Sequence, residues 1–90
     1  MKIKAGFTLK DICGEKVILA EGIENIDFSR MISLNETAAF LWNTLAEKGE
    51  ADERELAEAL CTEYDVDDET AAADVAALSR QWTEQGVVEP

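Results

Sequence analysis

Ninety residues can build one hydrophobic core but not two, so we expect a single domain over residues 1–90. Hydrophobic residues make up 47% of the sequence, and this content excludes a disordered tail. Twenty acidic residues against eight basic ones give a net charge of -12, which repels nucleic acid and anionic lipid and attracts basic surfaces.

The residue types that are absent narrow the function further. The sequence contains no histidine, the commonest general base and a frequent metal ligand, so we expect neither an enzyme nor a metal or cofactor site. No apolar run approaches the roughly 20 residues that span a bilayer, and residues 1–6 lack the apolar segment of a signal peptide. Cys13 and Cys61 lie far apart without a CxxC partner, which is typical of free thiols in a cytoplasmic protein.

The first half of the chain is expected to form an antiparallel sheet. Residues 7–12 and 16–20 read as two short strands, and residues 13–15 form a tight turn in which Gly14 adopts a positive φ. Apolar residues then alternate with polar ones up to Leu34, which predicts a third, half-buried strand. Arg30 interrupts its apolar face, so the strand is expected to begin near Phe28, with residues 22–25 as the connection.

After Leu34 the apolar period changes to that of helices. The first helix is predicted from a cap at Asn35 to a stop at Gly49, with apolar residues at steps of three and four. The second begins at a capping box formed by Asp52 and Glu55. The third helix is predicted to begin at Asp67 or Asp68 and to end at Gly86. Large core residues are expected on these helices at Trp42 and Trp82.

The acidic segments and the serines match two other types of site only in part. Asp65, Asp67 and Glu69 alternate as calcium ligands do, but the glycine and the final glutamate of a calcium loop are missing, so helix capping is the better interpretation. A phosphopantetheine carrier needs an Asp-Ser-Leu triplet at a helix start, and Ser33 instead follows an isoleucine. The carrier interpretation is therefore a minor one.

Three segments resemble the PqqD-like proteins, also called RiPP recognition elements. The clearest is Leu34–Ala38 followed by Leu41 and Trp42, which is similar to the family's Leu-Asn-x-Thr-Ala segment. The other two are the residues around Tyr64 and the last predicted helix, with its Gly-Val-Val ending at residues 86–88. This resemblance implies an α+β, winged-helix-like fold, in which a three-stranded antiparallel sheet is followed by three helices.

The resemblance also implies a function and a site. Members of the PqqD-like family are non-catalytic chaperones that bind the leader of a ribosomally synthesised precursor peptide and present it to a modifying enzyme, commonly a radical SAM protein. The leader adds as a strand beside the third strand, and the last helix forms the other wall of the groove. Carried over to this sequence, the implied peptide-binding residues are Phe28, Ser29, Arg30, Met31, Ile32, Ser33, Asp74, Ala77, Leu78 and Gln81.

Which flank of the last helix faces the groove is left open by the sequence. Small residues permit close approach of a peptide, and they occur on both sides of the core stripe. One flank contains Ala72, Ala76 and Ser79 and the other contains Asp74, Ala77 and Gln81, of which the second is favoured. Arg30 could either pair with an acidic leader residue or lie in solvent.

An alternative from another class is a winged-helix module that binds DNA in transcription or mediates a protein interaction. Charge argues against DNA, because Arg80 is the only basic residue of the last predicted helix and is accompanied by Asp74 and Glu84. A homodimer formed through the exposed third strand is the remaining expectation for a partner.

Overall fold

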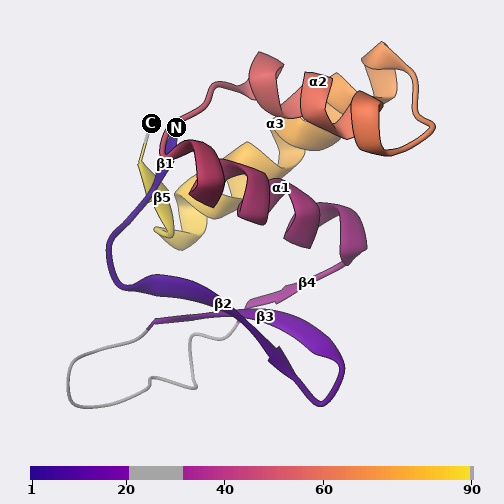
Figure 1. Ribbon diagram of the computed structural model, residues 1–90. Coiled ribbons are helices and arrows are strands. Elements are labelled where there is room, and N and C mark those ends of the chain that lie inside the picture. The colour runs from indigo at the N-terminus through magenta and orange to yellow at the C-terminus, as the bar shows by residue number, and fades with distance from the viewer. Residues whose placement is uncertain (21–31, 90) are drawn as a thin grey trace.

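The computed structural model describes residues 1–20 and 32–89 and confirms the expected α+β fold. A three-stranded antiparallel sheet is followed by three helices, and a small two-stranded sheet joins the chain ends (Figure 1). In chain order the elements are β1 Lys2–Ile3, β2 Phe7–Ile12, β3 Glu15–Ala20, β4 Ile32–Leu34, α1 Glu36–Lys48, α2 Glu53–Glu63, α3 Asp68–Gln85 and β5 Val88–Glu89.

The larger sheet has the order β2-β3-β4, so β3 is its central strand. The turn between β2 and β3 has two residues and not the three that were predicted, because Glu15 already pairs with Ile12. Cys13 and Gly14 have φ values of 55° and 85°. Positive φ at both turn positions is typical of a type I′ turn, whose twist matches that of the strands it joins. The hairpin therefore closes more tightly than the sequence suggested.

Each helix begins at the type of cap that the sequence predicted. The side chain of Asn35 accepts a hydrogen bond from the backbone N–H of Ala38, and Asp52 forms a complete capping box with Glu55. Asp67, and not Asp68, caps α3. These side chains satisfy N–H groups that have no partner within the helix.

In the described part of the chain, no helix has the length and apolar character to cross a membrane.

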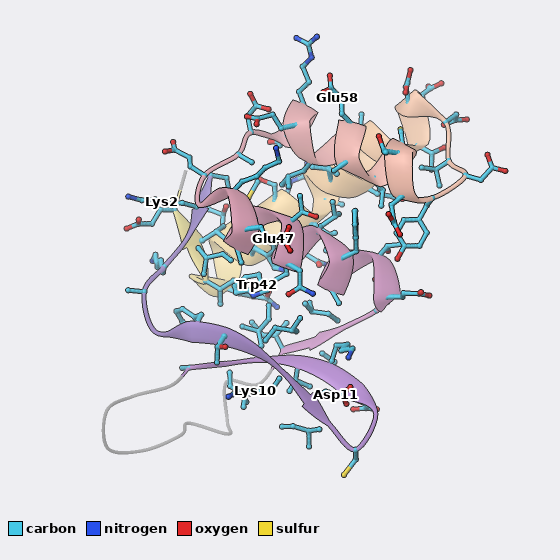
Figure 2. The ribbon with its side chains drawn as sticks, viewed as in Figure 1. Lys2, Lys10, Asp11, Trp42, Glu47 and Glu58 are labelled. Carbon is cyan, nitrogen blue, oxygen red and sulfur yellow. The ribbon has the colours of Figure 1, made fainter. Side chains whose placement is uncertain are left out.

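Two tryptophans form the centre of the core, as expected from the sequence. Trp42 of α1 and Trp82 of α3 are buried and meet edge to face, with ring centroids 5.3 Å apart. Figure 2 shows Trp42 on the inner side of α1. Ile18 of the central strand is also fully buried in this cluster, so the core joins the sheet to the helices. This packing fixes where α3 lies relative to the sheet.

The short β1–β5 sheet was not predicted. Ile3 pairs with Val88, and the two ends of the described chain lie side by side (Figure 1). The ion pair between Lys2 and Glu89 is 3.6 Å long and exposed to solvent, so it adds little stability. Burial of the Val88 side chain in the core is the stronger contribution.

Candidate functional site

Strand β4 lies at one margin of the larger sheet. Its inner side pairs with β3, in a register that joins Ile18 to Ile32 and Lys16 to Leu34. Among the described residues, no strand pairs with its outer side. The backbone N–H and C=O groups on such a margin can pair with another extended segment.

A groove of about 460 Å³ lies between this strand and the C-terminal half of α3. Apolar and polar residues from β4, α1 and α3 line it. Its described lining residues are Ile32, Ser33, Leu34, Asn35, Ala38, Leu78, Gln81, Trp82, Glu84 and Gln85.

Local geometry explains why these residues converge. Side chains alternate between the faces of a strand, so Ile32 and Leu34 pack against the core while Ser33 between them is exposed. On α3, the lining residues begin at Leu78 and recur at steps of three and four up to Gln85, which places them on one helical face. The groove therefore follows from two ordinary periodicities, brought together by the tryptophan core.

The polar side chains that line the groove differ in whether they take part in helix capping or are exposed to solvent. The Oδ1 atom of Asn35 accepts hydrogen bonds from the backbone N–H of Ala38 at 2.8 Å and from the hydroxyl of Thr37 at 3.0 Å, so it serves the helix cap. Gln81 and Glu84 are exposed. Glu84 is the one charged side chain among the described lining residues.

Four of the residues implied by the family resemblance meet at this groove: Ile32, Ser33, Leu78 and Gln81. Asp74 and Ala77 are exposed on α3 and lie outside the described lining. The other four implied residues fall outside the described residues. They are Phe28, Ser29, Arg30 and Met31.

The two flanks of α3 face different neighbours. Ala72 lines a separate hollow together with Ala57 and Cys61 of α2, whereas Gln81 lines the groove beside β4. Of the flank favoured from sequence, only Gln81 is part of the described lining.

The sequence prediction missed the lining residues that it had assigned to the core or to a cap, such as Trp82 and Asn35. The signal that could have found Trp82 and Gln85 is their helical spacing from Leu78.

The surroundings of Cys61 favour its protonated form. The Cys61 thiol donates a hydrogen bond to Oδ1 of Asp68 over 3.4 Å. Partial burial, and then this carboxylate, raise the pKa of Cys61 above its usual value, so the thiol stays protonated at neutral pH. Cys13 is exposed at the hairpin turn. A protonated Cys61 is a poor nucleophile.

Comparison with known families decides the affiliation of the chain. The family described as "Coenzyme PQQ synthesis protein D (PqqD)" matches residues 15–88. The chain belongs to the PqqD family. This match includes β3, β4 and all three helices, and thus both walls of the groove. The resemblance inferred from residues 34–42 and 86–88 is therefore confirmed.

Two solved structures share the fold of this PqqD-family chain over almost its whole length. "TbiB1 in Complex with the TbiA(beta) Leader Peptide" is 25% identical, with a TM-score of 0.76 over 99% of this chain and 95% of that chain. "Lasso peptide synthetase B1 complexed with the leader peptide" is 24% identical, with a TM-score of 0.73 over 99% of this chain and 96% of that chain. The search of curated proteins finds no match.

Proposed function

We propose that this PqqD-family domain binds the leader of a ribosomally synthesised precursor peptide as an added strand beside β4. One observation supports this most directly: the outer side of β4, unpaired among the described residues, lies next to a groove. The fold is that of two proteins whose structures are complexes with leader peptides. In this role the domain holds the leader and presents the remainder of the precursor to a modifying enzyme.

The geometry suits recognition by strand addition. Backbone hydrogen bonds to β4 give affinity that does not depend on the peptide sequence, and alternate side chains of the peptide enter the groove and give selectivity. The described part of β4 has only three residues, so few backbone bonds can form there. Contacts with the α3 residues that line the groove add to this affinity.

The other partners follow from this role. A radical SAM protein is the modifying enzyme that the family resemblance suggests, and the domain itself is proposed to be non-catalytic because the sequence lacks histidine. Two free thiols support a reducing compartment such as the cytoplasm. A second copy of the chain could pair with β4 to form a homodimer, and it would then compete with the leader.

The proposal is tested by nuclear magnetic resonance on labelled protein. Binders are first selected from a displayed library of random peptides, and each selected peptide is then titrated into the protein. We expect the largest backbone shifts at residues 32–34 and 78–85, because these segments form the two walls of the groove. Shifts confined to the β2–β3 turn or to α2 would contradict strand addition at β4.

Truncation of Leu78 gives a quantitative prediction. This half-buried side chain lines the groove, so Leu78→Ala removes apolar surface that a bound peptide would cover. The expected loss is about 1 kcal/mol of binding free energy, or roughly a fivefold weaker affinity by isothermal titration calorimetry.

Val66→Ala is the matched control for this variant. Val66 is also half-buried against the core, but it lies outside the groove. Both variants should lose some stability in urea unfolding, and only Leu78→Ala should lose affinity. Equal affinities for the two variants would mean that Leu78 does not contact the peptide.

A further inference from the structure

Glu84 gives the described lining of the groove its charge. Glu84 is the only charged residue among its described lining residues, and it is exposed near the C-terminal end of α3. None of the ion pairs in the described part of the chain includes Glu84. Its carboxylate is therefore available to a cation that enters the groove.

Among the described residues, no basic side chain lines the groove beside this carboxylate. Arg80 lies one turn earlier on α3, but it is exposed and does not line the groove. The whole chain has a net charge of -12, so the field around Glu84 is that of an acidic protein. Such a field raises the local concentration of basic segments and lowers that of acidic ones.

We propose that the groove selects leader segments with an apolar residue and a lysine or arginine at alternate positions, and that Glu84 binds the basic side chain. This inference rests on the proposed function. A strand added beside β4 would direct every second side chain toward α3. One such side chain would meet the half-buried Leu78, and the next would meet the exposed Glu84.

The expected size of the effect follows from the exposure of the carboxylate. Ion pairs at exposed sites contribute modestly, so replacing Glu84 by a neutral residue should weaken binding of a basic peptide about two- to fivefold. Salt screens such a pair, so the difference between wild type and variant should shrink as ionic strength rises. An acidic residue at the same peptide position would meet a like charge and be disfavoured.

The experiment compares peptide pools selected from one random displayed library by four proteins: wild type, Glu84→Gln, Glu84→Lys and Glu47→Gln. Glu47 lies on the exposed side of α1, away from the groove (Figure 2). Its replacement by glutamine changes the net charge by the same amount as Glu84→Gln. We expect Lys and Arg enrichment, two positions from an apolar residue, in the wild-type and Glu47→Gln pools. The Glu84→Gln pool should lose this enrichment, and the Glu84→Lys pool should gain acidic residues there.

Each outcome decides the inference. Equal basic enrichment in the Glu84→Gln and Glu47→Gln pools would overturn it, because overall acidity and not Glu84 would then select the charge. Mapping of the wild-type peptides by backbone shifts separates this result from failure of the proposed function. Peptides that shift residues 32–34 without any basic preference overturn only the role of Glu84, and peptides that bind elsewhere overturn both.

Discussion

At the scale of single residues, the cap of α3 links stability to pH. Asp67 accepts hydrogen bonds from the side chain and the backbone N–H of Thr70, and these bonds lower the pKa of its carboxyl group. A lowered pKa in the folded state stabilises the protein above the unfolded pKa, and this contribution is lost as pH falls through the folded value. Stability supplied by Asp67 should thus disappear in acid, below about pH 4.

Asp67→Asn tests this contribution. Asparagine can accept the same backbone hydrogen bond without a charge, so it keeps the cap and removes the titration. We expect the urea midpoint of the variant to fall less steeply than that of wild type between neutral and acidic pH. Parallel curves for the two proteins would show that the charge of Asp67 does not contribute.

Residues that act locally were the most predictable from the sequence. Asn35, Asp52 and Asp67 cap helices through bonds to residues three positions later, so their roles depend on little beyond the neighbouring sequence. The place of Glu84 could not be predicted in this way. Its place in a groove depends on how α3 packs against β4, and nothing within its own helix indicates this packing.

At the scale of elements, the β2–β3 hairpin contains a residue that is poorly matched to its conformation. Cys13 is the only described residue other than glycine with positive φ, at 55°. Asparagine tolerates this region better, and Asn-Gly is the preferred sequence of a type I′ turn. Cys13→Asn should therefore raise the free energy of unfolding by about 0.5 kcal/mol.

Gly14→Ala is the companion variant for the hairpin. An added Cβ at Gly14 meets no atom within 4 Å, so any effect of alanine comes from its φ of 85° and not from a clash. The expected loss is about 1 kcal/mol by urea unfolding. Two variants that change stability in opposite directions would confirm the turn type, and a loss in both would contradict it.

Elements were predictable where their signal is continuous along the chain. Each helix spans at least 11 residues and has a cap and an apolar period, and its expected limits agree with the structure. The β1–β5 sheet was missed because each strand has two residues, too few for an alternating pattern, and the partners come from opposite ends of the sequence. The groove was predicted only in part for the same reason: it is formed by elements distant in sequence.

At the scale of the whole molecule, net charge separates the proposed function from the DNA-binding alternative. A DNA-binding protein gains affinity by placing Lys and Arg against phosphates. Here α3 offers Arg80 alone among acidic residues, and the groove offers the carboxylate of Glu84. Both features oppose a polyanion and favour a basic peptide.

A gel-shift assay with random duplex DNA at low ionic strength tests this distinction under the conditions most favourable to DNA. Phosphate contacts are strongest in low salt, so a protein that binds duplex through even a few basic residues should retard it there. Because the chain has a net charge of -12, we expect no retardation. A peptide selected by the same protein should bind it, and the affinity should decrease as salt is added. Retardation that disappears with salt would reverse this assignment, because it would require a basic surface strong enough to overcome the charge of the whole chain.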